Sequence, residues 1–139
     1  MRKVVFLVVL TLLITGCNQQ FKVSEVAIGN VSHDMQEMIE DLENGNYLFS
    51  GEKEQYVFLN RGTVIQGEEA VVLSDFSADV KDQVLTISFN EAATSDYENK
   101  DVKHQLLYKI TGKGDYDTIL FEMNGKEIPI DSVIVKDYK

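Results

Sequence analysis

The single cysteine of the chain, Cys17, is the feature that most limits how the chain can fold. It stands directly after Gly16, at the end of an apolar run, and the sequence holds no second thiol for it to pair with. An intramolecular disulfide is therefore excluded, although a compartment outside the cytoplasm would permit one. The folded part must be stabilised by packing and hydrogen bonding alone.

The first sixteen residues predict export and not a membrane span. Arg2 and Lys3 form a positive cap, and the apolar run 4–14 follows them. A run of about ten apolar residues suits the core of a secretory signal and falls short of the ~20 that a spanning helix needs. Residues 1–16 are therefore predicted to be a signal peptide, cleaved at the bond between Gly16 and Cys17.

The residues Ile14-Thr15-Gly16-Cys17 resemble a lipobox, the lipidation and cleavage motif of bacterial lipoproteins. In that motif the thiol takes a diacylglyceryl group, with fatty acids such as palmitate, before cleavage. An ordinary signal more often ends in Ala-x-Ala, and a buried core cysteine needs neither the charged cap nor the apolar run. Two acyl chains hold a protein firmly on a membrane, whereas one chain binds marginally. We therefore expect Cys17 to be the lipidation site and the protein to lie on the extracytoplasmic face of the cell membrane.

Length and composition predict one acidic domain. Cleavage before Cys17 would leave 123 residues, enough for one hydrophobic core, with residues 17–22 as the lipidated tether and 23–139 as a single β-rich domain. The cleaved chain would carry 11 basic and 23 acidic side chains, a formal charge near −12. That charge disfavours nucleic acid and repels an anionic membrane surface, so the lipid is expected to be the membrane attachment.

The segment 32–46 predicts a helix. Its apolar residues follow the i, i+3, i+4, i+7 spacing of one helix face, and they are Met35, Met38, Ile39 and Leu42. Ser32 suits the N-cap position, and Asn44-Gly45 suits a left-handed stop. The simplest interpretation is a core-packing helix with a solvated acidic back. The alternative is a methionine-bearing groove for a partner.

From Tyr47 onward the apolar period changes to two, which predicts a meandering antiparallel sheet. The predicted strands are 47–50, 55–60, 70–80, 83–90 and 104–110, with a short strand within 21–28 and another at 131–135. In the strand 70–80 the alternation places four residues on one face, namely Val72, Phe76, Ala78 and Val80. Lys81-Asp82 is expected to be a tight connection, and the polar stretch 91–103 an exposed loop.

The segment 118–130 is the best local match to a hairpin. Asn124-Gly125 can form a type I′ turn, because both residues tolerate positive φ. The resulting register places two apolar pairs on one buried face, Phe121 with Ile128 and Ile119 with Ile130. Pro129 lacks an N–H, so its strand is expected at an edge or a bulge.

These elements predict a mainly β protein with one helix. About seven β-segments fit a small antiparallel barrel or sandwich, with the helix packed against one face or one end. The alternative is an α+β fold with one antiparallel sheet.

No catalytic residue, metal ligand or cofactor is predicted. His33 and His104 stand far apart in the sequence, without the His-x-x-x-His or cysteine-pair spacing of a metal site, and are expected to be surface or structural residues. The sequence lacks a Gly-x-Ser-x-Gly elbow and a phosphate-binding glycine loop. Four oxygen-bearing residues in the polar stretch suggest a weak cation site, namely Asp96, Glu98, Asn99 and Asp101. That stretch lacks the mid-loop glycine of a calcium loop and has Leu107 at the twelfth position.

Three segments resemble the small β-rich domain of bacterial protease-complex regulator lipoproteins of the PrcB type. They are QYVFLNRGTVIQG (55–67), QVLTISFNEAA (83–93) and HQLLYKI (104–110). Where that family has a Thr-Gly-Gly-Tyr-like turn, residues 64–69 read VIQGEE, so the resemblance transfers no functional residue. In size and layout the chain also resembles small lipoproteins of low-GC Gram-positive bacteria, and its eleven lysines against two arginines agree with that source.

These observations lead to three hypotheses for function. The first is a non-enzymatic binding or interaction module, tethered to the membrane through Cys17, whose partner is an envelope protein or a small ligand. The second is an enzyme or enzyme inhibitor that acts on cell-envelope peptides. The third is a lipocalin-like carrier of a small apolar ligand, which would need an apolar cavity of matching size.

Overall fold

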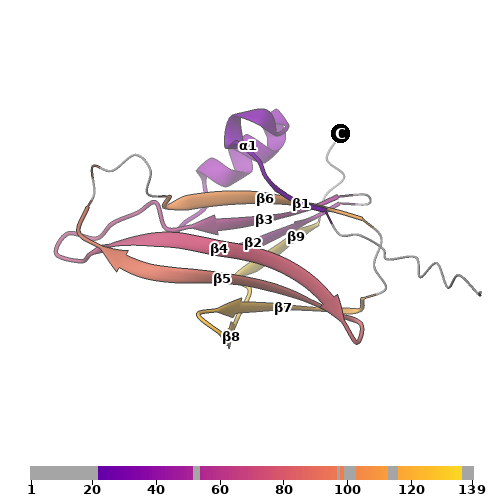
Figure 1. Cartoon of the computed structure of the whole chain (residues 1–139). Helices are drawn as coiled ribbons and strands as arrows, with labels where there is room; N and C mark the ends of the chain where they lie inside the picture. Colours follow the sequence, from indigo (N-terminus) through magenta and orange to yellow (C-terminus); the bar gives the residue numbers. More distant parts are fainter. Residues whose placement is uncertain (1–21, 52–53, 97, 99–102, 113–115, 136–139) are drawn as a thin grey trace, which may run out of the picture.

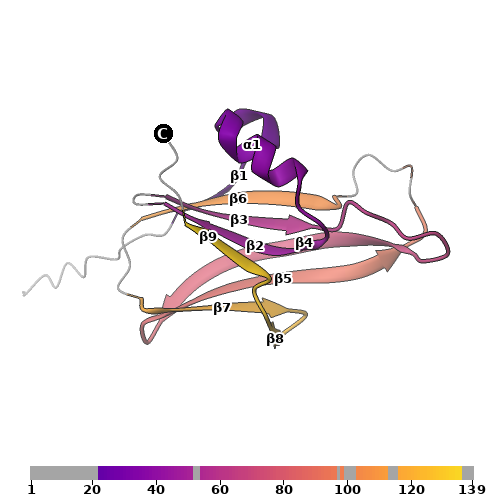
Figure 2. The same ribbon diagram turned by 180° about the vertical axis from the view of Figure 1, so that it is seen from behind.

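The computed structural model describes residues 22–51, 54–96, 98, 103–112 and 116–135. Gly16 and Cys17 lie outside these residues, as do Asn99 and Asp101 of the suggested cation site. The described part has three layers, with a helix on one face of a first β-sheet and a second sheet against the opposite face (Figures 1 and 2). Within it, no helix has the length and apolarity needed to cross a membrane.

Nine strands, one α-helix and one short 3₁₀ helix make up the described part. In chain order they are β1 (Lys22–Glu25), the 3₁₀ turn (Ile28–Asn30), α1 (His33–Glu40), β2 (Gly45–Ser50), β3 (Glu54–Asn60), β4 (Ala70–Lys81), β5 (Val84–Thr94), β6 (Gln105–Thr111), β7 (Thr118–Met123), β8 (Lys126–Ile128) and β9 (Ser132–Val135). The first sheet, which we call sheet A, has the order β1-β6-β3-β2-β9, and sheet B has the order β4-β5-β7-β8.

The two sheets pack as a sandwich, which confirms the predicted mainly β class with one helix. Neither sheet closes into a barrel. The expectation of a purely antiparallel arrangement is wrong, because β2 pairs with β9 and β5 pairs with β7 in parallel. Both parallel pairs arise because the chain crosses between the sheets. After β5 in sheet B the chain forms β6 in sheet A and then returns to sheet B as β7, which lies parallel to β5. After β8 it crosses again to sheet A and forms β9, which lies parallel to β2.

The apolar core lies in two layers, one on each face of sheet A. Between the sheets are ten buried residues, namely Leu48, Val57, Leu59, Leu73, Leu85, Ile87, Phe89, Leu106, Ile110 and Phe121. On the other face, α1 and sheet A enclose six more, namely Met35, Ile39, Tyr47, Phe49, Phe58 and Leu107. Because both faces of sheet A are covered, β2 and β3 each contain consecutive buried residues and do not alternate.

The helix starts where the sequence predicts and ends earlier. The Ser32 Oγ accepts a hydrogen bond from the Met35 N–H at 3.4 Å, which confirms the N-cap. The helix ends at Glu40 and not at 46, because the residues after Asn44 extend to pair with β3 and Gly45 is already the first residue of β2.

A β-bulge divides β4 and corrects the predicted face. The register with β5 shifts between Ser74 and Ser77, and Asp75 has a positive φ of 54°. Beyond the bulge the predicted residues pack against the inter-sheet core, namely Phe76, Ala78 and Val80. Before it, Leu73 takes the inward position at 4% exposure, so the assignment of Val72 to that face is wrong.

Two predicted connections are also corrected. Lys81 pairs with Val84, so the turn is formed by Asp82 and Gln83, both with positive φ, and not by Lys81-Asp82. The β5 strand continues to Thr94, so residues 91–94 of the predicted loop are strand. Residues 91–94 pair with the first half of β4, and this pairing extends the strand into the polar stretch.

The β7–β8 hairpin confirms the predicted turn and register. Asn124 and Gly125 have φ of 52° and 78°, and Phe121 pairs with Ile128. The strand β8 ends before Pro129 at the edge of sheet B, so Ile119 and Ile130 are not a ladder pair, although both pack against the same core.

The positive φ at Gly125 leads to a stability prediction. Gly125→Ala is expected to lower the free energy of unfolding by about 1 kcal/mol, because an L-residue with a Cβ is strained in the left-handed region. Gly29→Ala is the matched control, since a Cβ at either position meets no atom within 4 Å and Gly29 lacks a positive φ. Urea unfolding of both variants measures the difference. Equal stabilities would contradict the type I′ assignment.

Candidate functional site

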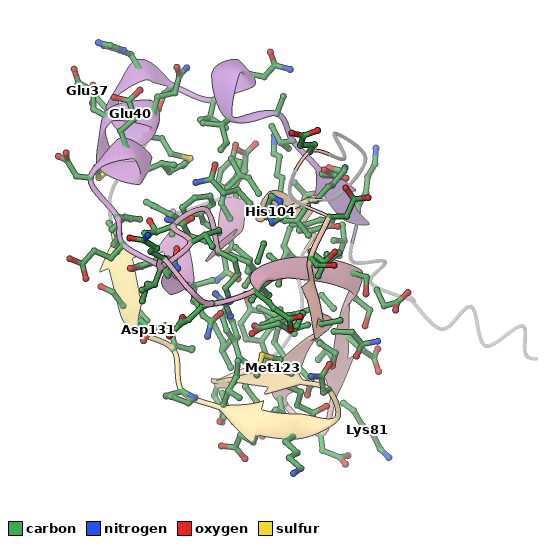
Figure 3. All side chains as sticks on the ribbon, turned by 90° about the vertical axis from the view of Figure 1, so that its left-hand side faces the viewer. Glu37, Glu40, Lys81, His104, Met123 and Asp131 are labelled. Atoms are coloured by element: carbon green, nitrogen blue, oxygen red, sulfur yellow. The ribbon has the colours of Figure 1, made fainter. Side chains whose placement is uncertain are left out.

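An open cleft of about 790 Å³ lies at one end of the molecule, between α1 and sheet A. Its apolar wall consists of Ile28, Ile39 and Leu42, from the helical side. The polar walls come from the end of β3, the start of β6 and the end of β1. Figure 3 views this end of the molecule and labels Glu40 on the helix and His104 beside the start of β6.

Asn60, at the end of β3, holds the walls of the cleft together. Its Nδ2 donates to the carbonyl oxygens of Leu42 at 2.9 Å and Glu43 at 3.1 Å. Its Oδ1 accepts from the Gly62 N–H and from the Gln105 Nε2, both at 2.9 Å. The side chain is 4% exposed, so four hydrogen bonds offset the cost of burying its amide.

The loop after β3 is fixed by a pair of reciprocal bonds. The Asn44 Nδ2 donates to the Thr63 carbonyl oxygen at 2.7 Å, and the Thr63 N–H donates to the Asn44 Oδ1 at 3.0 Å. The Thr63 side chain therefore stands at the cleft on a fixed backbone.

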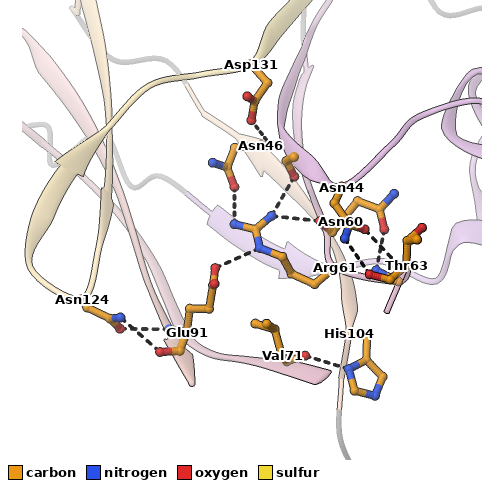
Figure 4. A network of polar contacts seen from close by, with 12 residues as sticks. Asn44, Asn46, Asn60, Arg61, Thr63, Val71, Glu91, His104, Asn124 and Asp131 are labelled. Atoms are coloured by element: carbon orange, nitrogen blue, oxygen red, sulfur yellow. Dashed lines mark hydrogen bonds and ion pairs between the residues drawn. The ribbon is translucent and has the colours of Figure 1, made fainter. Parts of the chain in front are cut away.

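Arg61 lies behind the cleft and joins both sheets (Figure 4). Its Nε donates to the Glu91 carboxylate on β5 at 2.9 Å, and its Nη2 donates to the Asn46 Oδ1 at 2.8 Å. Its Nη1 donates to the carbonyl oxygens of Gly45 and Asn60. The guanidinium thus makes four hydrogen bonds while its side chain is 12% exposed, which marks it as a structural group and not a ligand-binding one.

The same network continues to the last strand and the β7–β8 turn. The Asn46 N–H donates to the Asp131 carboxylate at 2.7 Å, just before β9. The Asn124 Oδ1 accepts from the Glu91 N–H, and its Nδ2 donates to the Glu91 carbonyl oxygen. Five parts of the chain, near residues 46, 61, 91, 124 and 131, are therefore joined by polar contacts.

The ring of His104 has a defined tautomer. Its Nδ1 lies 2.7 Å from the Val71 carbonyl oxygen on β4. Because a carbonyl can only accept, Nδ1 carries a proton, and in the neutral form of the ring Nε2 is then an acceptor. His104 also lines the cleft, so this histidine both bonds to sheet B and borders the cleft beside sheet A.

Three charged side chains stand at the walls of the cleft. Glu25 and Lys103 form an ion pair, and the hydrogen bond that the Lys103 ammonium donates to the Glu25 carboxylate raises the pKa of Lys103. Glu40 also lines the cleft, and in the described part of the chain its carboxylate has no partner.

The structure separates the residues that the sequence singled out. His33 is exposed and lies 3.1 Å from Glu37 one helical turn away, at the surface. His104 belongs to the cleft, which was not expected. Neither histidine bonds a serine, threonine or tyrosine hydroxyl among the described residues. In those residues, no three histidine, cysteine, aspartate or glutamate side chains gather as a metal site would require.

Most cleft residues could not be found from the sequence. They come from segments near 25, 40, 60 and 104, which only the fold brings together. The sequence offered one signal for a neighbouring residue that does not line the cleft, because Arg61 is the only arginine after the predicted signal peptide, in a chain otherwise rich in lysine.

Comparisons with known proteins found no relative of this chain. No family model, no curated protein and no solved structure matches the chain.

Proposed function

We propose that the protein is an extracytoplasmic lipoprotein, tethered to the membrane through Cys17, whose domain is a non-enzymatic binding module with its ligand in the cleft between α1 and sheet A. The observation that carries the binding role is the construction of the cleft. Its walls are held by Asn60 and Asn44 through bonds to the main chain. Such a preformed cleft, with an apolar wall and a few fixed polar groups, is typical of a ligand site.

The position of the cleft suits a tethered receptor. Five residue steps separate Cys17 from Lys22, which limits the tether to about 17 Å. Lys22 pairs with Thr111 at one end of β6, whereas the cleft lies at Gln105, at the other end. The six residue steps between Gln105 and Thr111 span about 20 Å. Lys22 and the start of β6, which borders the cleft, therefore lie toward opposite ends of sheet A (Figure 1), which leaves this border of the cleft accessible to other molecules of the cell envelope.

The other hypotheses receive less support. A carrier of the lipocalin kind needs a cavity inside the β-structure, and here ten buried side chains pack between the sheets. An enzyme needs a nucleophile or an acid–base pair, and the described hydrogen bonds of the histidines nominate neither.

Filling the cleft tests the binding role. Thr63→Trp is expected to block the cleft, because the Thr63 side chain lines it and its backbone is held by Asn44. Thr86→Trp is the control, since Thr86 lies between buried Leu85 and Ile87 and so points to the outer face of sheet B. Envelope extracts are passed over each immobilised chain, and bound proteins and small molecules are identified by mass spectrometry.

We expect the unaltered chain and the Thr86→Trp variant to retain the same ligands. The Thr63→Trp variant should lose them. Identical sets on all three chains would contradict a ligand in this cleft.

A further inference from the structure

Three acceptor groups at the cleft have no partner among the described residues. The Gln105 Nε2 donates to Asn60, and the Gln105 Oε1 has no partner among the described residues. The His104 Nε2 is an acceptor, because Nδ1 donates to Val71. Glu40 adds an unpaired carboxylate. The one cationic side chain that lines the cleft, Lys103, gives one of its three N–H groups to Glu25, and its charge is balanced by that carboxylate. A ligand that satisfies these groups must itself donate hydrogen bonds.

The charge at the cleft favours a cation. Glu25 and Lys103 balance each other, which leaves the charge of Glu40 uncompensated. Glu40 is the last residue of α1, and the last turn of α1 contains no basic residue. The carbonyl end of a helix carries a partial negative charge and stabilises cations. The whole chain is acidic, with a formal charge of −10.

The apolar surface indicates a polypeptide. Ile28, Ile39 and Leu42 provide a wall against which the alkyl part of a lysine or arginine side chain can pack. Directly after the cleft residue Thr63, Val64 and Ile65 are 42% and 61% exposed. They extend the apolar surface beyond the cleft and can contact further residues of a bound segment, which a free amine would leave uncovered.

Building on the proposed binding role, we infer that the cleft takes a basic polypeptide segment. A lysine or arginine side chain of that segment pairs with Glu40, and an N–H of the segment donates to the Nε2 of His104. Neighbouring apolar residues of the segment cover Val64 and Ile65.

Two substitutions isolate the inferred contacts. Glu40→Gln removes the charge at the helix end, and Glu127→Gln removes one charge from β8 on sheet B, outside the cleft. His104→Asn keeps an N–H donor for Val71, because the asparagine Nδ2 is attached to Cγ as the histidine Nδ1 is, and removes the Nε2 acceptor. Thermal unfolding of each variant reports whether the fold is kept.

Binding is measured with labelled decapeptide pools on the full chain, purified from membranes in nonionic detergent. Each pool is randomised at eight positions and carries Leu-Lys, Leu-Glu or Leu-norleucine at the two central positions. Fluorescence anisotropy is recorded at about 150 mM salt, where the Debye length of about 8 Å screens the overall charge.

We expect the Leu-Lys pool to bind most tightly. Glu40→Gln and His104→Asn should each weaken that binding about fivefold, the size expected of one partly exposed polar contact, while Glu127→Gln leaves it unchanged. Equal binding of the three pools, or an equal loss with Glu127→Gln, would overturn the inference. Displacement of the pool by n-butylamine at the same concentration would overturn the polypeptide part and assign the cleft to free amines.

The two proposals can fail separately. Pools that bind without preference for lysine but are lost with Thr63→Trp would refute the basic segment and keep the cleft as a binding site. Pools that Thr63→Trp still binds as tightly would contradict the cleft itself.

Discussion

Arg61→Met is expected to lower the free energy of unfolding by about 3 kcal/mol. Methionine fills much of the same space but donates no hydrogen bonds, so Glu91, Asn46 and the Gly45 carbonyl would lose their partner together. The ion pair is mostly buried, with the Arg61 side chain 12% and the Glu91 side chain 23% exposed. Removing one member of such a pair leaves a poorly solvated charge, which is why the loss exceeds that of a surface ion pair.

A double substitution separates the lost charge pair from lost packing. Arg61→Met combined with Glu91→Met removes both charges, and it should recover part of the stability lost in Arg61→Met alone. Arg61→Lys should fall between, because an ammonium keeps the charge without the planar fork that reaches four acceptors. Urea unfolding at neutral pH measures all three variants. A double variant less stable than the single one would show that Glu91 is stabilised without Arg61.

Local features of the sequence were sufficient where a turn or cap decides the structure. Ser32 begins the helix because its hydroxyl satisfies a free N–H, and Asn124-Gly125 forms the turn because both residues accept positive φ. Both effects act within a few residues, so they can be predicted from the local sequence. The end of the helix was misplaced because tertiary pairing decides it. Gly45 is drawn into β2 by β3, fifteen residues further on.

Long-range pairing is what the sequence did not show. The parallel pairs β2–β9 and β5–β7 depend on strands crossing between sheets, and no local pattern encodes that path. The consecutive apolar residues 57–59 did contain a signal, since a strand with both faces buried needs no alternation. The bulge at Asp75 reverses the inward face within one strand, and an alternation counted across it fails.

Long-range contacts are also the reason that the cleft could not be predicted from local sequence patterns. Glu40 and His104 face one cleft because α1 packs on sheet A and β6 lies beside β3. His104 was expected to be a surface or structural residue, and its bond to Val71 agrees with a structural role. The binding role that we propose for its second nitrogen depends on the neighbours that the fold supplies.

Cys17→Ala is expected to abolish acylation of the protein. The alanine side chain lacks the thiol that would carry the diacylglyceryl group, so incorporation of labelled palmitate should fall to background. Mass spectrometry of the unaltered chain should find residues 1–16 removed and Cys17 acylated at the new amino terminus. In the variant, any chain that retains the leader has an apolar run of about ten residues, too short to span a bilayer as firmly as a transmembrane helix.

Gln19→Ala is the control for the anchor, because it changes the tether and leaves Gly16 and Cys17 intact. It should incorporate the label and resist extraction from membranes by alkaline carbonate, as two acyl chains require. Carbonate should release a larger share of the Cys17→Ala chain. Equal labelling of the two variants, or an unaltered chain with an intact Met1 and an unmodified thiol, would contradict the lipid anchor. The cleft is built from residues beyond the tether, so the peptide binding inferred above should persist in Cys17→Ala even as the anchor is lost.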